Sequence, residues 1–371
     1  MKVLHIITRI NSGGTARWLE TLCFGLREYG HDVHLAAGFV ETNEMEDPLF
    51  ESMKSARVRH LSREITFFLI GDIKAFFEVR RLIVSIQPDI LNTHTSKAGL
   101  IARAAALTIK INRPIIIHTF HGHLLYGYFA PWKTKLIVRL ERFLARRSRA
   151  LIVSGEVVKR DLLDNQIGKP SDYYVVNPGV QTLEKLSKSD AKDYFGLRHG
   201  QICVGWLGRM TSVKDPNLVI ELARRLPEID FLMCGDGELL EKLRVTSPDN
   251  VYLPGWSSSQ LAWSASDIAI LTSRNEAQPI ALIEAASSGL PTVAFNVGGV
   301  SGVVENGSTG YLVSDVSEME IMLSRLASSA NLRQSLGMEA EKKASLDFGV
   351  SQFMNKHIDI YREVLDEKNE F

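Results

Sequence analysis

Short apolar runs of strand length alternate with longer, helically periodic segments along almost the whole chain. The first run, KVLHII (2–7), precedes a glycine-containing loop and a helical pattern that Gly30 ends. The next runs are DVHLAAG, DILNTH, PIIIHTF, ALIVSG and YYVVNPG. Runs that are apolar throughout are typical of parallel strands buried on both faces. The sequence therefore predicts an α/β fold with a doubly wound parallel sheet.

The pattern starts again in the second half of the chain, at ICVGWLGRM (202–210). It continues through DFLMCGDGE, VYLPGW, DIAILTS, PTVAFNVGG and TGYLVS. A length of 371 residues is enough for two such domains. We therefore expect two Rossmann-like domains, the first over residues 1–180 and the second over 201–351. The polar stretch 181–200 would be a linker with a lead-in helix.

In a doubly wound sheet, ligands bind beyond the carboxyl ends of the strands, so the residues after each strand are the candidate site. DIAILTS precedes RNEAQPIALIEAASSG, in which Pro279 suits the first position of a helix that Gly289 ends. Gln278 would lie near the helix cap. The amides of Ile280 and Ala281 would point out of the helix N-terminus, where geometry and the helix dipole favour an anion.

Two carboxylates accompany this predicted helix. Glu276 lies in the loop before it, and Glu284 lies inside it among apolar and small residues. A buried carboxylate without a hydrogen-bond partner is costly in free energy, and paired hydroxyls of a ligand would be suitable partners for Glu284. A half-exposed helix face that leaves Glu284 in solvent is the alternative. The residues alone leave both interpretations open.

The loop GWLGRMTSVKDP, after the first strand of the second half, carries two cations. Arg209 and Lys214 beside a helix N-terminus would suit a diphosphate, because arginine can contact phosphate oxygens in a bidentate way. Gly208 permits close approach of the backbone. Gly235, in CGDGE, belongs to a turn at the same edge of the sheet. Solvated surface charges are the alternative interpretation of such a pair.

The first half offers three histidines in HTFHGH (118–123), directly after a predicted strand. Their spacing does not match the usual zinc patterns, and no carboxylate or cysteine lies close in sequence, so we expect no metal. A histidine that hydrogen-bonds a hydroxyl or stabilises developing charge is the better hypothesis. NSGG (11–14) forms at most a small turn. No GxGxxG with a downstream acidic residue is present, so we expect no dinucleotide or other cofactor.

The two halves differ in charge. Residues 1–185 hold 26 lysines and arginines against 18 aspartates and glutamates, whereas the rest of the chain holds 17 against 25. This asymmetry indicates domains with different partners, although chance composition would look the same. We expect no nucleic acid as partner, because the acidic half would repel it and no recognition module is visible.

The segment KTKLIVRLERFLARRSRA (133–150) combines a basic face with an apolar one. The apolar face is formed by Leu136, Ile137, Leu140, Phe143 and Leu144. This segment is either a core helix with a solvated basic face or a helix that rests near anionic lipid head groups.

The compartment follows from three further observations. Cys23, Cys203 and Cys234 are too widely spaced to form a disulfide framework or a metal site. The apolar run at the N-terminus is too short for a signal peptide, and no stretch approaches the ~20 apolar residues of a spanning helix. We expect a cytoplasmic protein, and peripheral association with the inner face of the cytoplasmic membrane is a further hypothesis.

Together, these motifs resemble the family-4 retaining glycosyltransferases of GT-B fold, in particular bacterial members that build surface polysaccharides. EAQPIALIE matches their two glutamates separated by seven residues, GRMTSVKD resembles their diphosphate-binding segment, and HTFHGH resembles a segment common in the bacterial members. TSVKDP and AFNVGGVSGVVENGSTGYLV fit as well, so the likeness covers nearly the whole chain. Two positions depart from the family, which often has Gly at Ala277 and Glu at Gly302.

The resemblance implies two Rossmann-like domains facing across a cleft, an acceptor-side N-terminal domain and a nucleotide-sugar-binding C-terminal domain. The last segment, 352–371, would pack back on the N-terminal domain as a helix. Glu284 would bind the ribose hydroxyls of the nucleotide, and Glu276 would contact hydroxyls of the transferred sugar.

The remaining roles implied by the resemblance concern the diphosphate and the acceptor. Arg209 and Lys214 would hold the diphosphate, helped by the amides that follow Gln278. His121 would lie in the wall of the N-terminal domain by the sugar and the acceptor, and Gly14 would let the first loop approach the site.

The implied activity is retaining, metal-independent hexosyl transfer from a nucleoside diphosphate sugar to an acceptor hydroxyl. The family's usual nucleotide is UDP, and the acceptor would be a saccharide or a lipid-linked saccharide in surface polysaccharide biosynthesis. Two alternatives are a nucleotide-sugar epimerase on the same fold and a catalytically silent nucleotide-binding scaffold. The intact set of Arg209, Lys214 and two glutamates argues against the silent scaffold.

Overall fold

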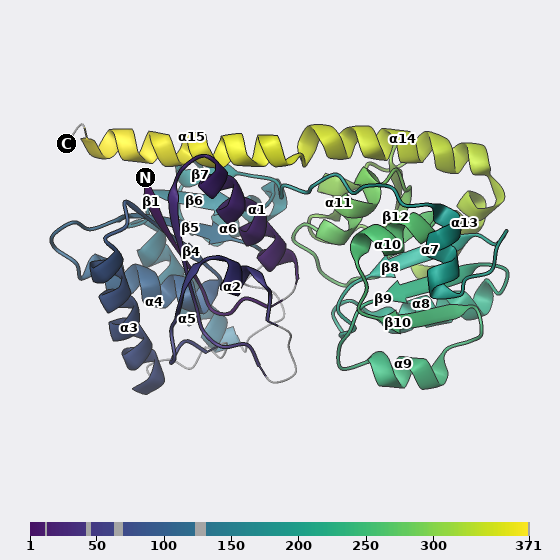
Figure 1. The fold of residues 1–371 in the computed structure, drawn as a ribbon, viewed down its shortest axis with the longest axis horizontal. Helices are drawn as coiled ribbons and strands as arrows, with labels where there is room; N and C mark the ends of the chain where they lie inside the picture. Colours follow the sequence, from purple (N-terminus) through teal and green to yellow (C-terminus); the bar gives the residue numbers. More distant parts are fainter. Residues whose placement is uncertain (12, 42–45, 63–69, 123–130, 370–371) are drawn as a thin grey trace. The chain divides into compact units, whose positions relative to one another are not determined.

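The computed structural model describes residues 1–11, 13–41, 46–62, 70–122 and 131–369 (Figure 1). Two compact units divide the chain. The N-terminal domain comprises Met1–Gly179 with Val350–Phe371, and the C-terminal domain comprises Val180–Gly349. The stretch 181–200 therefore belongs to the C-terminal domain, while the last helix belongs to the N-terminal one.

The N-terminal domain is built on a parallel sheet of seven described strands in the order β3-β2-β1-β4-β5-β6-β7. Their bounds are β1 Lys2–Ile7, β2 Asp32–Ala37, β3 Lys54–Arg57, β4 Ile90–His94, β5 Ile115–Phe120, β6 Ala150–Val153 and β7 Tyr173–Val175. The strand order reverses between β1 and β4, which is the topological switch point where ligands bind in such sheets.

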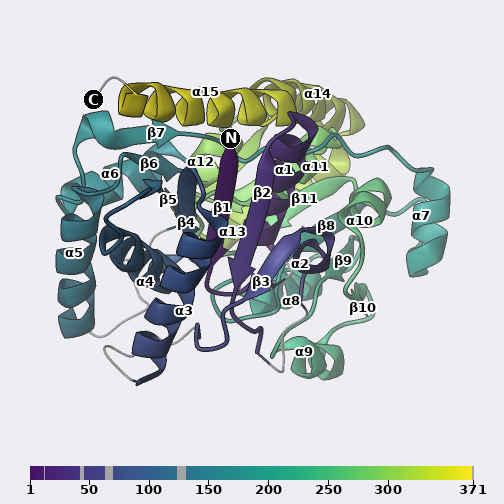
Figure 2. The same cartoon turned by 60° about the vertical axis from the view of Figure 1, so that its left-hand side comes forward.

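Helices cover both faces of this sheet (Figures 1 and 2). Their bounds are α1 Gly14–Glu28, α2 Leu49–Ser52, α3 Ile70–Ile86, α4 Ser96–Leu107, α5 Pro131–Ala145, α6 Glu156–Asp164 and α15 Val350–Asn369, with a 3₁₀ turn at Pro170–Asp172. Side chains alternate along a strand. Val3 and Ile7 of β1 therefore pack with α1 and α15, whereas Leu4 and Ile6 pack with α3 and α4.

The helix α15 is part of the N-terminal core. Its buried Tyr361 accepts a hydrogen bond of 2.7 Å from Asn92 Nδ2 of β4, and Asn92 Oδ1 accepts one of 3.0 Å from Thr119 of β5. A Cβ on Gly179 would lie 2.6 Å from the side chain of Phe353. A larger residue at 179 would therefore push α15 away from the sheet.

The C-terminal domain is built on a parallel sheet of six strands in the order β10-β9-β8-β11-β12-β13, with its switch point between β8 and β11. The strands are β8 Cys203–Leu207, β9 Asp230–Cys234, β10 Val251–Gly255, β11 Ile268–Leu271, β12 Thr292–Phe295 and β13 Gly310–Val313. The helices are α7 Lys188–Phe195, α8 Pro216–Arg225, α9 Leu240–Thr246, α10 Ser259–Ala265, α11 Ile280–Ser287, α12 Val300–Val303, α13 Val316–Ser328 and α14 Ala330–Asp347. The predicted doubly wound fold is confirmed in both domains.

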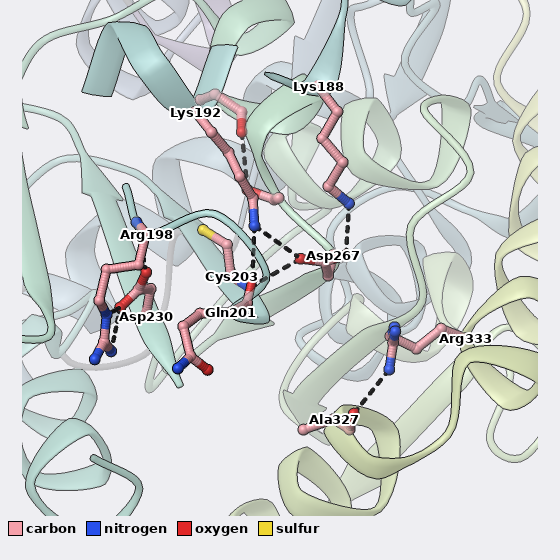
Figure 3. A network of polar contacts seen from close by, with 11 residues as sticks. Lys188, Lys192, Arg198, Gln201, Cys203, Asp230, Asp267, Ala327 and Arg333 are labelled. Carbon is pink, nitrogen blue, oxygen red and sulfur yellow. Dashed lines mark hydrogen bonds and ion pairs between the residues drawn. The ribbon is translucent and has the colours of Figure 1, made fainter. Parts of the chain in front are cut away.

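A polar network ties α7 to the amino ends of the strands of this sheet (Figure 3). Asp267, just before β11, pairs with Lys188 at 2.5 Å and with the buried Lys192 at 3.9 Å. Arg198 Nε donates to Asp230, the fully buried first residue of β9, at 2.8 Å. The network satisfies buried charges at the amino edge. The opposite, carboxyl edge is the one that carries the candidate site.

Residues 133–145 of the basic segment lie in α5, and the burial of this helix differs from the predicted apolar face. Ile137 and Leu144 are buried as expected, but Phe143 is 49% exposed, with the Arg147 guanidinium 3.6 Å from its ring centroid. The opposite occurs at Glu141, which is buried and forms an ion pair with Arg103 of α4 at 2.7 Å. None of the described helices is long and apolar enough to cross a membrane.

Candidate functional site

Two loops of the C-terminal domain meet at the switch point between β8 and β11. Lys214, in the loop after β8, forms an ion pair with Glu276, in the loop after β11. The side chain of Glu276 is only 8% exposed, and that of Lys214 is 28% exposed. The hydroxyl of Thr272 donates to the Lys214 carbonyl at 2.9 Å, which fixes the two loops together. The structure therefore places a predicted cation and a predicted carboxylate side by side.

Arg209 is exposed at the same carboxyl edge, in the loop directly after β8. This loop lies against the loop after β9, because Met210 N donates to Asp236 O at 2.9 Å. Gly235 has φ +148°, and a Cβ there would lie 1.8 Å from Gly208 O. Only glycine fits position 235 without moving the backbone that presents Arg209.

The helix α11 begins one residue later than predicted, with Pro279 as its N-cap at φ −77° and ψ 99°. The first hydrogen bond of the helix runs from Leu282 N to Pro279 O at 3.0 Å, so the amides of Ile280 and Ala281 precede the helical ladder. Gly289 follows the helix at φ +76°, as expected for its end.

Glu284 lies on the less buried face of α11. Ala281, one turn before it, is also half-buried, whereas Leu282, Ile283 and Ala285 are buried against the domain core. The apolar character of the helix therefore comes from its other faces. A half-buried carboxylate can meet a ligand without the full cost of desolvation, so this geometry is compatible with both interpretations drawn from the sequence.

Gly299, at the end of the loop after β12, supports the Glu276 loop and was missed by the sequence reasoning. Its amide donates to Glu276 O at 2.9 Å, and a Cβ there would lie 1.5 Å from Ala277 O. Gly302 lies close to Gln278, since a Cβ at 302 would be 3.3 Å from Gln278 Nε2. The Gly-Gly pair in NVGGV was the signal that could have pointed to this contact.

In the N-terminal domain, Gly14 and His121 both lie at the carboxyl edge of the sheet. Gly14 is the exposed first residue of α1, directly after the β1 loop. His121 follows β5, and Trp18 of α1 packs edge-on against its ring at 5.3 Å between centroids. His121 Nε2 also hydrogen-bonds His94 Nδ1 at 2.9 Å. Burial lowers the pKa of His121 to about 3, so its ring is neutral at physiological pH.

The histidines of HTFHGH do not gather into one site. His118 faces α4 and hydrogen-bonds Thr93 at 2.8 Å, while His121 faces α1, because the two side chains leave opposite faces of the sheet. His123 lies outside the described residues. Within the described ranges, no three histidine, cysteine or acidic side chains are grouped so that they could hold a metal ion.

Two family models match consecutive parts of the chain. The model described as Glycosyltransferase Family 4 matches residues 12–183, and the model described as Glycosyl transferases group 1 matches residues 187–343. An *Escherichia coli* relative is 30% identical over 292 residues, which cover 74% of this chain and 74% of the relative. It is named UDP-Gal:alpha-D-GlcNAc-diphosphoundecaprenol alpha-1,3-galactosyltransferase. The chain belongs to glycosyltransferase family 4.

One further relative and two solved structures are similar over nearly the whole chain. The capsular polysaccharide biosynthesis glycosyltransferase CapM of *Staphylococcus aureus* is 24% identical, over 99% of this chain and 98% of CapM. The structure of *Anabaena* HepE in complex with UDP and glucose has a TM-score of 0.82 at 18% identity, over 98% of this chain and all of HepE. Sucrose-phosphate synthase from *Thermosynechococcus elongatus* has a TM-score of 0.83 at 16% identity, over 99% of this chain and all of the synthase. These structures show that the family-4 chain has the GT-B fold.

The family membership makes this chain a glycosyltransferase. Its C-terminal domain collects Arg209, the Lys214–Glu276 pair and the N-terminus of α11 at one edge of the sheet. Cations and unbonded amides can stabilise a diphosphate, and carboxylates can accept hydrogen bonds from hydroxyls. The chemistry available at this edge is therefore that of binding a phosphorylated, hydroxyl-rich ligand.

Proposed function

We propose that this glycosyltransferase moves a sugar from a UDP-sugar to an acceptor hydroxyl with retention at the anomeric carbon. The observation that carries the proposal is the Lys214–Glu276 ion pair at the β8–β11 switch point, next to the N-terminus of α11. Lys214 is a cation suited to the diphosphate, and Glu276 is a carboxylate suited to the sugar hydroxyls. The two side chains are adjacent, as the diphosphate and the sugar are in a UDP-sugar. The names of the *E. coli* relative and of the HepE complex support UDP as the nucleotide.

In the proposed reaction, the bond between the anomeric carbon and the diphosphate oxygen breaks as the acceptor oxygen bonds to the same face of that carbon. The acceptor proton moves to the departing phosphate oxygen, so no enzyme nucleophile is needed. Arg209, Lys214 and the amides of Ile280 and Ala281 would stabilise the charge that develops on the diphosphate. These fixed cations would do the work of a metal ion, so the reaction should proceed undiminished in a chelator.

The proposal is tested first by ligand-induced stabilisation, with UDP, GDP, ADP and NAD as separate ligands. A ligand at 100 times its dissociation constant stabilises its domain by about 2.7 kcal/mol, which raises the unfolding midpoint by several degrees. We expect this shift with UDP. A shift with NAD alone would contradict the proposal.

The second test measures sugar transfer from UDP-sugars to lipid-linked saccharide acceptors, with and without EDTA. The anomeric coupling constant of the product reports its configuration. Retained configuration and unchanged rates in EDTA are expected. An isomerised nucleotide sugar formed without acceptor would instead identify an epimerase.

We further propose a lipid-linked saccharide as acceptor and peripheral association with the cytoplasmic face of the membrane. The name of the *E. coli* relative, which includes an undecaprenol diphosphate acceptor, supports the first part. The surface of α5 supports the second, since Trp132 is 61% exposed, Lys135 and Arg139 are exposed on the same helix, and Arg146 is exposed directly after it. Exposed aromatic and basic side chains are typical of helices that lie on anionic lipid.

Vesicle sedimentation tests this surface. The protein should sediment with anionic but not with neutral vesicles, and salt should weaken the effect because it screens exposed charges. The double variant Arg139→Glu/Arg146→Glu should lose this binding. The control Lys242→Glu, on α9 of the C-terminal domain, should retain it. Equal sedimentation with both kinds of vesicle would contradict the membrane proposal.

A further inference from the structure

Three imidazole rings form a hydrogen-bonded chain in the N-terminal domain. His5 Nδ1 lies 3.0 Å from His94 Nε2, and His94 Nδ1 lies 2.9 Å from His121 Nε2. The ring centroids are 5.3 Å apart for the first pair and 5.1 Å apart for the second. The chain runs from the fully buried His5 and His94 to the half-buried His121.

The register of the sheet explains why these rings meet. β1 pairs with β4 at the switch point, and β4 pairs with β5 on its other side. His5 of β1, His94 of β4 and His121 after β5 all project to the face covered by α1 and α15. The histidine chain therefore ends at the carboxyl edge of the sheet, where ligands of doubly wound domains bind.

All three rings are neutral near pH 7. Burial lowers the pKa of His5 and of His121 to about 3, and burial together with the neighbouring histidines lowers the pKa of His94 well below its usual value. A neutral imidazole has one N–H donor and one acceptor nitrogen. In an unbroken chain, the tautomer of one ring therefore fixes the tautomers of the other two.

The surroundings of His5 select one of the two possible directions of hydrogen-bond donation along the histidine chain. His5 Nε2 is buried and has no hydrogen-bond partner among the described residues. A buried N–H without a partner is rarer in proteins than an acceptor without one, which favours His5 with its proton on Nδ1. His5 then donates to His94, His94 donates to His121, and His121 also carries its proton on Nδ1. No described residue bonds Nδ1 of His121.

We infer that His94 and His5 are positioning residues that hold His121 as a neutral Nδ1–H donor for a hydroxyl oxygen of the transferred sugar. This inference rests on the proposed function and on the family resemblance, which implies a position for His121 by the sugar and the acceptor. The structure adds that the hydrogen bond from His94 orients the ring of His121 and determines which of its nitrogens carries the proton. Both ring nitrogens of His94 form hydrogen bonds within the histidine chain, so replacing His94 removes both of these bonds.

The first test is spectroscopic and does not depend on activity. In protein labelled with ¹⁵N-histidine, we expect the His121 resonances of the Nδ1–H tautomer, assigned with a His121→Asn variant. In His94→Leu the same resonances should move toward a mixture of tautomers. Nε2 protonation of His121 in the wild type, or unchanged resonances in His94→Leu, would overturn the inference.

The second test is kinetic and uses a conservative rescue. His94→Leu should lower kcat/KM by about tenfold to a hundredfold, because a misplaced contact at the reacting sugar is costly. His94→Asn should recover most of this loss, since its amide nitrogen can replace Nδ1 as donor to His121. UDP binding should stay within twofold in both variants, because UDP is assigned to the C-terminal domain. Equal kcat/KM in all three proteins would refute the positioning role.

The matched control is His118→Asn. His118 is equally buried in β5 but faces α4 and is no member of the chain. In the His118→Asn variant, we expect the tautomer of His121 and the value of kcat/KM to match those of the wild type. The thermal unfolding of each variant is measured alongside. If the wild type binds UDP but transfers no sugar, the proposed function and the donor role both fail. The tautomer result would then still decide whether the histidine chain sets the proton of His121.

Discussion

Replacing Arg209 with alanine should lower turnover by a factor on the order of 10² or more, as the loss of other charge-stabilising donors does. The side chain is exposed, so its removal should leave the unfolding midpoint nearly unchanged. The loss should fall on kcat rather than on the binding of the intact UDP-sugar, because the diphosphate gains charge only as its bond to the sugar breaks. Steady-state kinetics and thermal unfolding of the same preparation measure both quantities.

Lys214 requires a different variant, because its removal also leaves the carboxylate of Glu276 without its cation. Glu276 is only 8% exposed, and an unpaired carboxylate at that depth destabilises the fold. Lys214→Met should therefore lose both turnover and stability. The double variant Lys214→Met/Glu276→Gln should recover stability, because no charge is then left alone, but it should not recover turnover.

The matched control for both cations is Arg225→Ala, at the far end of α8 in the same domain. Arg225 forms exposed ion pairs with Glu221 and Glu320, and such pairs contribute little to stability. We expect its turnover to equal that of the wild type. Near-normal turnover in Arg209→Ala and in Lys214→Met would rule out a diphosphate role for these cations.

The sequence predicts the strands of both sheets well where burial sets the pattern. A strand covered on both faces is mostly apolar, and the run at 2–7 coincides with β1 for this reason. The strand β3, KSAR, was not predicted. It lies at the edge of the described sheet, pairs with β2 and has mostly half-exposed residues, so nothing in its composition distinguishes it from a loop.

The sequence predicts which loops form the candidate site, but it does not predict which side chains of those loops contact each other. Residues after strands can be identified from the chain order, which is how Arg209 and Glu276 were selected. The pairing of Lys214 with Glu276 depends on β8 lying beside β11, two strands that are distant in sequence. Hydrophobic periodicity carries no information on which strands become neighbours.

The histidine chain shows the same limit. His5 and His94 lie within apolar runs and look like ordinary strand residues, so only His121 was selected. Their meeting depends on the register of three strands and on the face to which each side chain points. The spacing within HTFHGH does not reveal either that His118 and His121 leave opposite faces of the sheet.

Glu284→Ala should weaken the binding of UDP by about tenfold to a hundredfold, if the carboxylate accepts hydrogen bonds from the ribose. Hydrogen bonds to a charged group contribute about 1.5–3 kcal/mol, which corresponds to that range. Isothermal titration of the purified protein with UDP measures the loss.

The decisive comparison uses 2′-deoxy-UDP, which lacks one of the two ribose hydroxyls. If Glu284 binds that hydroxyl, the deoxy nucleotide should bind the wild type more weakly than UDP does, whereas Glu284→Ala should bind both nucleotides equally. This cycle isolates the contact between carboxylate and hydroxyl from any general loosening of α11, because loosening would weaken both ligands alike. An equal preference for UDP in both proteins would show that Glu284 does not contact the 2′-hydroxyl.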